Sequence, residues 1–138
     1  MVNLPPNRSM PPGTFIPVLA YDDVGEAVAW LCETFGFRER WRAGSHRAQL
    51  AFGDGAVAVT ERQSGSEGSL VMVRVADVDA HCEHARGRGA LILEPPAEYP
   101  YGERQYMVED LGGHRWTFSQ SVADVAPEHW GGTSGDLD

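Results

Sequence analysis

Apolar and polar positions alternate along several stretches of the chain, most clearly in its last third. In His114–Ser119, Trp116 and Phe118 alternate with polar residues, which is the period of a strand with one apolar face. A second extended segment, Arg104–Glu109, precedes it, and the intervening Asp110-Leu-Gly-Gly is turn-forming sequence. The pattern favours a β-hairpin at the end of a sheet, with an irregular loop as the alternative.

Two other segments have the apolar spacing of helices. Asp23 is a predicted N-cap with Glu26 three positions later, which is a capping box, and Gly36 ends this helix. Asp77 is the predicted N-cap of a second helix. Each helix has an apolar stripe that faces a core. The stripes comprise Val24, Ala27, Val28, Leu31 and Phe35 in the first helix, and Val78, Cys82 and Ala85 in the second.

Short apolar or alternating segments predict six further strands. They are Thr14–Tyr21, Phe37–Arg42, Arg47–Phe52, Ala56–Glu61, Ser69–Val75 and Leu91–Glu94, with Pro95–Gly102 as a loop. The order repeats, because Asp23 and Asp77 are 54 positions apart (77 − 23) and so are Phe37 and Leu91 (91 − 37). We therefore predict an α+β protein in which a strand–helix–three-strand (βαβββ) unit occurs twice and two units pair.

Changes of composition set the expected boundaries. The chain of 138 residues has the size of one domain or of two small modules that share a core. Prolines crowd the N-terminal stretch, and Gly, Ser and Asp the C-terminal one, so both are expected to be flexible or draped over the surface. The expected parts are a flexible extension 1–13, a first module 14–63, a linker 64–68, a second module 69–121 and a tail 122–138.

Charge and hydropathy narrow the range of partners. The formal net charge of −9 argues against nucleic acid, which needs a basic face. An acidic surface favours solubility, and attraction of a cationic ligand is the alternative. The sequence contains no membrane-length apolar run and no signal-peptide pattern, so a cytoplasmic location is expected. Cys32 and Cys82 are interpreted as small buried residues rather than a disulfide.

Four stretches resemble one known superfamily. IPVLAYDDVGEAVAWLCETFGF, LAFGDGAV, VADVDAHCEHARGRGALILEPP and YGERQYMVEDLGGHRWTF, within roughly 14–120, are similar to the vicinal oxygen chelate superfamily. This superfamily includes glyoxalase I, bleomycin-resistance proteins, fosfomycin-modifying enzymes and extradiol dioxygenases, and the match is to its glyoxalase/bleomycin-resistance-like branch. The resemblance implies two βαβββ modules that form a curved mixed sheet around a cleft, and a homodimer. It does not specify the chemistry, because the superfamily hosts many reactions.

The metal enzymes of this superfamily carry His, Gln or Glu on the first strand of each module and Glu on the last. The corresponding positions here are Ile16, Val59, Leu70 and Thr117. Three are apolar and one is a neutral hydroxyl, so none is a usual ligand for a divalent ion. Neighbours of the same parity add only Glu61. We therefore expect no metal and no other cofactor, with a divalent ion as the alternative.

Strand parity predicts which side chains line the cleft. If Trp116 and Phe118 pack under the helices, the opposite faces form an apolar pocket with a few polar groups. Its expected ligand-binding residues are Ile16, Val18, Gln49, Leu70, Met72, Arg74, Gln105, Met107, Arg115 and Thr117, and the resemblance adds Val59. Arg74 and Arg115 could grip a carboxylate or phosphate, or else reach the rim and pair with acidic residues.

Other reactive side chains carry weaker interpretations. His81, Cys82 and His84 are close in sequence, but Cys82 lies about 100° around the helix from His81, so a solvated helix face is expected rather than a zinc site. His114 is expected to be a hydrogen-bonding surface residue of the turn, although it and His46 could be general bases.

The leading functional hypothesis is a metal-independent protein that binds and sequesters a drug-like or metabolite ligand, as bleomycin-resistance proteins do. The alternative is a metal-dependent lyase, isomerase or dioxygenase with a displaced site near Glu61 or Glu109. A third possibility is a structural or regulatory module. The sequence does not decide whether the chain is an enzyme, and it does not identify the ligand.

Overall fold

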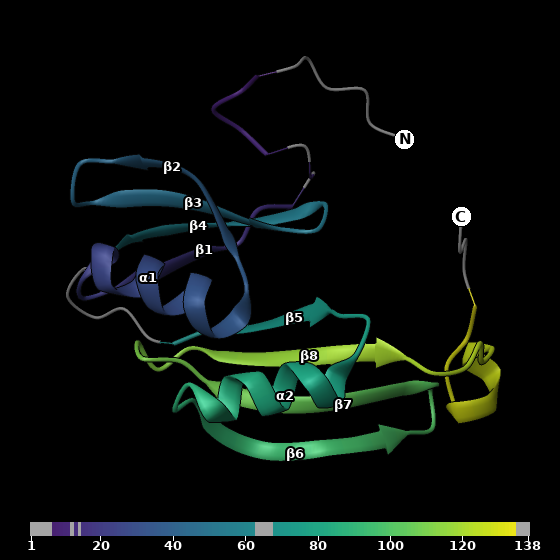
Figure 1. The fold of residues 1–138 in the computed structure, drawn as a ribbon. Coiled ribbons are helices and arrows are strands. Elements are labelled where there is room, and N and C mark those ends of the chain that lie inside the picture. The colour runs from purple at the N-terminus through teal and green to yellow at the C-terminus, as the bar shows by residue number, and fades with distance from the viewer. Residues whose placement is uncertain (1–6, 12, 14, 63–67, 135–138) are drawn as a thin grey trace. The chain divides into compact units, whose positions relative to one another are not determined.

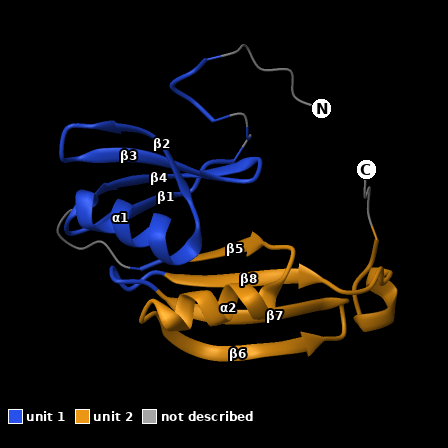
Figure 2. Cartoon of the chain, viewed as in Figure 1, with its two compact units in different colours: residues 1–69, 110–114 blue, residues 70–109, 115–138 orange. Residues whose placement is uncertain are grey.

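A computed structural model of the chain describes residues 7–11, 13, 15–62 and 68–134. The chain divides into two compact units, shown in different colours in Figure 2. Unit 1 comprises Met1–Ser69 together with Asp110–His114, and unit 2 comprises Leu70–Glu109 together with Arg115–Asp138. Most of the expected linker, parts of the expected N-terminal extension and the end of the expected tail lie outside the described residues.

Unit 1 contains one helix against one face of a four-stranded mixed sheet (Figure 1). β1 pairs in parallel with β4, and the other pairs are antiparallel, in the order β1-β4-β3-β2. The elements are β1 (Val18–Tyr21), α1 (Val24–Phe35), β2 (Arg38–Ala43), β3 (Arg47–Phe52) and β4 (Gly55–Glu61). The first strand is therefore shorter than the predicted Thr14–Tyr21.

Unit 2 repeats this plan, with the order β5-β8-β7-β6 and a parallel β5–β8 pair. Its elements are β5 (Leu70–Arg74), α2 (Val78–Gly87), β6 (Leu91–Tyr99), β7 (Glu103–Glu109) and β8 (Arg115–Ser121), followed by the short 3-10 helix η1 (Pro127–Trp130). The predicted α+β class and the twice-repeated βαβββ order are thus confirmed. The described strands form two four-stranded mixed sheets, one in each unit.

The predicted helix ends have the expected hydrogen bonds. The Asp23 carboxylate accepts from the backbone N–H of Glu26 at 2.9 Å, and Asp77 accepts from Ala80 at 3.0 Å. Gly36 has φ of +82°, a conformation that glycine adopts without a Cβ clash. The stripes expected to face the core are buried, and among the described helices none is long and apolar enough to cross a membrane.

Each helix covers one face of its sheet, and the opposite face is called the open face below. In unit 1, Leu19, Leu50 and Val59 are buried. In unit 2, the fully buried residues Trp116 and Phe118 alternate along β8 with residues of the open face. Because strand side chains alternate between faces, these buried residues fix the face on which every other residue of each sheet lies.

β6 corrects the prediction that residues 95–102 form a loop. The strand continues through Pro95 and Pro96 to Tyr99. β6 is the last strand of its sheet, and its pairing with β7 is irregular between Glu94 and Ala97. Proline lacks the N–H that an interior strand needs, but an edge strand with a bulge tolerates it. The two prolines therefore indicate an edge strand rather than its end.

The turn Asp110–His114 belongs to unit 1 and is organised by a buried carboxylate. One Asp110 oxygen accepts from the backbone N–H groups of Gly112 and His114, at 2.9 and 3.0 Å. The other accepts from the hydroxyl of Tyr21 at 2.6 Å. Burial, with help from the Asp110 charge, raises the pKa of Tyr21 above its ordinary value, so this phenol stays a donor.

His114 is buried, with 1% of its surface exposed, and the expectation of a surface histidine is wrong. Its Nδ1 accepts from the backbone N–H of Ser69 at 2.9 Å, and its Nε2 donates to the carbonyl of Ala20 at 2.5 Å. This pair of bonds requires the neutral ring with the proton on Nε2. Both ring nitrogens are engaged in holding the turn, so His114 has a structural role here.

Candidate functional site

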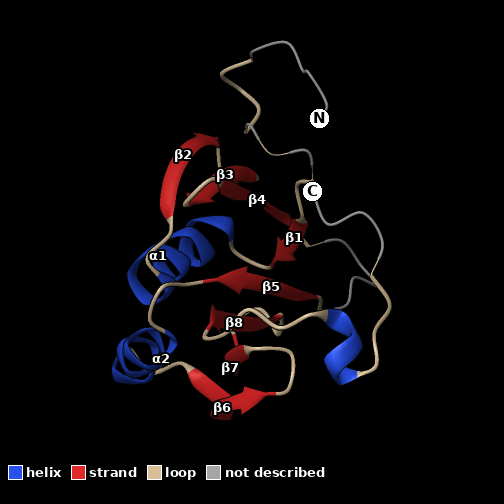
Figure 3. Ribbon diagram, turned by 90° about the vertical axis from the view of Figure 1, so that its right-hand side faces the viewer, coloured by secondary structure: helices blue, strands red, loops and turns tan. Residues whose placement is uncertain are grey.

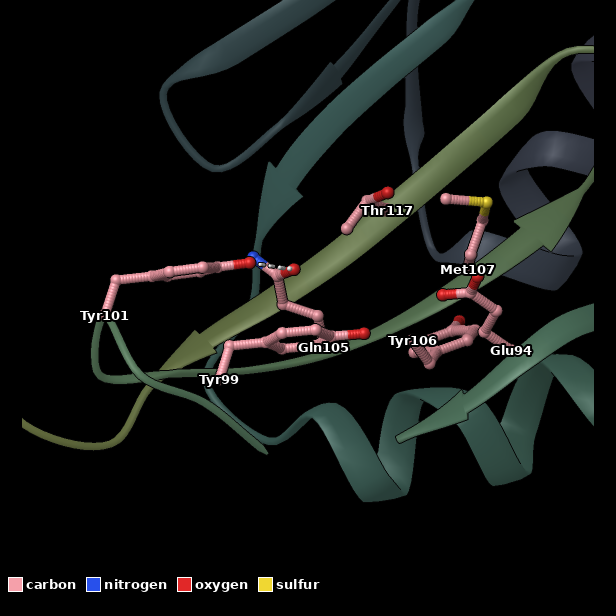
Figure 4. Close-up of a pocket in the computed structure, with 7 residues that line it drawn as sticks. All are labelled: Glu94, Tyr99, Tyr101, Gln105, Tyr106, Met107 and Thr117. Carbon is pink, nitrogen blue, oxygen red and sulfur yellow. Dashed lines mark hydrogen bonds between the residues drawn. The ribbon is translucent and has the colours of Figure 1, made fainter. Parts of the chain in front are cut away.

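A pocket of about 150 Å³ opens on unit 2. Figure 4 shows its lining, which comes from β6, the turn after it, β7 and β8. The lining residues are Glu94, Tyr99, Tyr101, Gln105, Tyr106, Met107 and Thr117. Three of them, Gln105, Met107 and Thr117, are among the residues that strand parity predicted for ligand binding.

A chain of hydrogen bonds fixes the amide of Gln105. Its Nε2 donates to the hydroxyl of Ser119 at 2.9 Å, and that hydroxyl donates to Glu103 at 2.7 Å. On the other side, the Tyr101 hydroxyl donates to Gln105 Oε1 at 3.3 Å, as drawn in Figure 4. Gln105 is buried, and such satisfied polar groups in a pocket wall have a defined orientation.

The same chain of bonds changes the ionisation of Glu103. Burial opposes its charge, but hydrogen bonds from Ser121 and Ser119 and the positive charge of Arg74 outweigh burial, so the pKa of Glu103 lies below its ordinary value. Arg74 itself donates to Ser121 at 3.0 Å. Beside the pocket, the open face therefore carries a carboxylate that stays charged.

Aromatic rings form the rim of the pocket. The rings of Tyr99 and Tyr101 are stacked, with centroids 5.6 Å apart and planes 12° apart. Trp130, at the end of η1, meets Tyr101 edge-to-face at 5.9 Å. The segment after β8 thus returns to the pocket rim. Aromatic faces of this kind bind flat or cationic groups.

The other predicted residues of unit 2 lie on the open face but outside the lining. Leu70 and Met72 are on the edge strand β5, each 62% exposed. Arg115 is paired in register with Leu70, and its guanidinium lies 3.9 Å from the Glu109 carboxylate. Pairing with an acidic residue, the alternative considered for Arg115, is therefore what the structure shows.

In unit 1, strand register separates the predicted residues. Val18 and Gln49 both pair with Ala58 and share the open face, whereas Ile16 lies ahead of β1 and is half-buried. Val59 pairs with Leu19 and is fully buried on the face that α1 covers. Its assignment to the open face was wrong by one position.

The comparison with family models identifies the chain. The model of the Glyoxalase/Bleomycin resistance protein/Dioxygenase superfamily matches residues 16–118. The chain belongs to this superfamily. The resemblance inferred from the sequence is thereby confirmed.

Individual relatives agree with this membership. The structure of TioX from Micromonospora sp. ML1 is 35% identical, with a TM-score of 0.70, and the match covers 83% of this chain and 100% of TioX. TnmS3 of Streptomyces sp. CB03234, described as an antibiotic binding protein, shares the fold at 24% identity, with a TM-score of 0.67 over 77% of this chain and 93% of its own. An uncharacterized protein of Mycobacterium tuberculosis is 30% identical over 71 residues, which are 51% of this chain and 42% of that protein. The chain thus spans less than half the length of this curated relative.

The superfamily's metal centre does not fit the residues found here. In unit 1 the expected position Val59 is buried under α1, and the neighbouring open-face residue of β4, Ala58, has no ligating atom. In unit 2, Thr117 lies opposite Met72. These side chains offer one neutral hydroxyl, which is a poor donor set for a divalent ion. Among the residues that the structure describes, no group of three or more His, Cys, Asp and Glu could hold a metal ion.

Packing also accounts for His81 on α2 and for the two cysteines, Cys32 on α1 and Cys82 on α2. His81 lies 4.1 Å from the ring of Phe118, centroid to centroid, and its Nδ1 is 2.6 Å from the hydroxyl of Tyr106. It is thus packed against the sheet and not on the solvated face that we expected. Burial raises the pKa of Cys82 and of Cys32, the opposite of what a reactive thiol needs.

Sequence reasoning missed Glu94, Tyr99, Tyr101 and Tyr106 as pocket residues. Tyr99 was missed because the predicted strand ended at Glu94, whereas β6 continues to Tyr99. Tyr99 pairs with Glu103, and Glu94 with Met107, so both lie on the open face. The available signal was the pair of prolines, which is typical of an edge strand.

Proposed function

We propose that this chain is a small-molecule binding protein whose ligand site is the pocket on unit 2. The observation that carries the proposal is the composition of the pocket wall. Stacked aromatic rings and the Met107 side chain offer apolar area, while the oriented Gln105 amide and the Thr117 hydroxyl offer hydrogen bonds. An apolar wall with a few placed polar groups is the usual form of such a site.

The lining favours a flat ligand that carries positive charge. Tyr99 and Tyr101 present aromatic faces, and Glu94 adds a carboxylate at the same pocket. The formal net charge of −9 favours the approach of cations. In this proposal, Gln105 and Thr117 orient the ligand, and the protein acts by sequestering it.

The small volume supports association with a second copy. Drug-sized ligands occupy sites of about 300–1,000 Å³, so a pocket of about 150 Å³ would hold only part of such a ligand. The exposed apolar side chains Leu70 and Met72 on the open face would gain by being covered. We infer a homodimer whose partner encloses the rest of the ligand, and light scattering of the purified protein tests this.

Binding is proposed to be independent of metal, because the positions that the resemblance assigns to the metal centre, Ile16, Val59, Leu70 and Thr117, offer one neutral hydroxyl and no usual ligand for a divalent ion. The shared fold of TnmS3, described as an antibiotic binding protein, supports a binding role. A cytoplasmic location is part of the proposal, and the free thiols of Cys32 and Cys82 support it, since a reducing compartment keeps thiols unpaired.

A thermal-shift screen with a chelator present tests the proposal. The compounds are flat aromatic amines, each with an uncharged analogue of the same shape. We expect several amines to raise the melting temperature in proportion to the logarithm of their concentration, as linkage requires. Stabilisation that requires added metal, or no stabilisation by any compound, would contradict the proposal.

Glu94→Gln is the informative variant, and Glu98→Gln is its matched control. Glu98 is on the same strand, but it pairs with Arg104 and therefore lies on the face opposite to the open face. Because Glu94 is exposed, its charge is worth about 0.2–1 kcal/mol. Glu94→Gln should weaken amine binding by roughly 1.4- to fivefold and leave the uncharged analogues unchanged. Equal effects of the two substitutions would remove Glu94 from the site.

A further inference from the structure

A segment ahead of β1 lies on the open face of the unit 1 sheet. Figures 1 and 3 show this segment on the side of the sheet opposite α1. The carbonyl of Ser9 accepts from Trp41 Nε1 at 3.2 Å and from Gln49 Nε2 at 3.4 Å. The carbonyl of Arg8 accepts from Arg40 Nη2 at 3.2 Å. Three side-chain donors thus bind two successive backbone carbonyls.

A β-bulge brings the three donors together. In the β2–β3 pairing, Glu39 is opposite Leu50 and Trp41 is opposite Gln49, so Arg40 has no opposite residue. An extra residue of this kind re-aims the side chains around it. Arg40 and Trp41 are adjacent in sequence, and in a regular strand their side chains would point to opposite faces. Here Arg40 donates to Gln49 and to the carbonyl of Arg8, and Trp41 donates to the carbonyl of Ser9.

Gln49 is a buried, hydrogen-bonded side chain and not a surface residue. It is only 3% exposed. Arg40 Nη1 donates to its Oε1, which orients the amide so that Nε2 is directed to the carbonyl of Ser9. With the segment in place the Gln49 amide is buried, where an unpaired donor would be costly, and the carbonyl of Ser9 is the acceptor that pairs it.

The segment is shaped to supply that acceptor. The Asn7 side chain accepts from the backbone N–H of Ser9, and the Asn7 carbonyl accepts from Met10, each at 3.0 Å. This turn leaves the carbonyls of Arg8 and Ser9 free to face the donors. Pro11 is buried, whereas Met10 is half exposed.

We propose that Arg40, Trp41 and Gln49 form a second binding site, specific for two successive amide carbonyls, and that the segment Asn7–Pro11 occupies it as an intramolecular ligand. All three contacts go to backbone carbonyls of the segment, so another extended peptide fits the same donors. Such a peptide competes with the segment, whose tether gives it an effective concentration of about millimolar. Unit 1 then releases the segment Asn7–Pro11 and binds the peptide in its place.

The first test is cleavage by trypsin at Arg8 in the full chain under native conditions. Cleavage requires the segment to leave the donors, so its rate reports the population of the open form. Trp41→Phe keeps the ring and removes the N–H donor, and Gln49→Glu keeps the acceptor for Arg40 and removes the donor. Each should accelerate cleavage roughly fivefold, the factor for one hydrogen bond of about 1 kcal/mol. The matched control is Trp30→Phe, on the helix covering the other face, which should not change the rate. Unchanged cleavage in both site variants would overturn the proposal.

The second test supplies the segment in trans. In the variant Asn7→Ala/Pro11→Gly the segment loses its turn and its buried anchor, while the three donors are untouched. We expect the capped peptide Asn-Arg-Ser-Met-Pro to shift the Trp41 indole N–H resonance of this variant with a dissociation constant of about 0.1 mM, and to shift that of the wild type about tenfold less readily, because the tethered segment competes at about 1 mM. Equal response of the two proteins, or none in either up to about 10 mM peptide, would overturn the exchange.

Discussion

The hydrogen bond between Tyr21 and Asp110 provides the sharpest stability prediction. The two oxygens are 2.6 Å apart, Tyr21 is 1% exposed and Asp110 is 6% exposed. Tyr21→Phe removes the donor without changing the ring, so the surrounding packing is retained. A carboxylate oxygen that is almost excluded from water then loses its phenol partner.

The expected cost follows from the charge on the acceptor. Hydrogen bonds to charged groups contribute about 1.5–3 kcal/mol, compared with about 1 kcal/mol for neutral pairs. Tyr21→Phe should therefore lower the free energy of unfolding by about 1.5–3 kcal/mol. Urea denaturation followed by circular dichroism measures it from the midpoint and slope.

The matched control is Tyr99→Phe, because Tyr99 is a half-buried residue at the end of β6. For its hydroxyl the structure shows no hydrogen bond among the described residues, and surface changes of this kind stay within about 0.5 kcal/mol. A loss for Tyr21→Phe as small as that for Tyr99→Phe would refute the assignment of Asp110 as the organiser of the turn.

Two further predictions concern ionisation and backbone space. Because folding lowers the pKa of Glu103, its contribution to stability is present above its ordinary pKa and is lost as pH falls through the lowered value. Ser119→Ala removes a hydrogen bond to this carboxylate and should raise the pKa of Glu103. A ¹³C carboxyl titration that gives the same pKa in the variant and the wild type would contradict this. A Cβ at Gly112 would lie 2.5 Å from Cδ1 of Tyr21, so Gly112→Ala should destabilise by about 1–3 kcal/mol. Gly87 has open space and ordinary φ, so Gly87→Ala should stabilise by about 0.4–1 kcal/mol, and thermal melts that reverse this order would be inconsistent with the packing.

Features set by neighbouring residues could be predicted from the sequence. Asp23 and Asp77 are N-caps because a side-chain oxygen reaches a backbone N–H three positions later, and that geometry is local. The repeat was recognised because both units use the same local signals in the same order. Local signals also placed Gln105, Met107 and Thr117 together, since β7 and β8 form a hairpin with a fixed register.

Features set by distant residues could not be predicted in this way. The face of Val59 is an exception, because the β3–β4 hairpin pairs Gln49 with Ala58 and so fixes it locally. The position taken from the resemblance was one residue off, and a shift of one residue reverses the face. The burial of His114 depends on Ala20 and Ser69, far from it in sequence. The contact of Ser9 with Gln49 likewise joins residues 40 positions apart, in a stretch whose prolines predicted only that it would be flexible or draped over the surface.

The most direct test of the proposed ligand site is methyl NMR of the full chain labelled at methionine, with a chelator present. The chain has four methionines, of which Met107 lines the pocket and Met10 lies in unit 1. Titration with the most stabilising aromatic amine should shift the Met107 methyl resonance in a saturable way and leave that of Met10 unchanged. A saturable shift at Met10 with Met107 unmoved, or binding that disappears when the chelator is added, would contradict a metal-independent ligand site in this pocket.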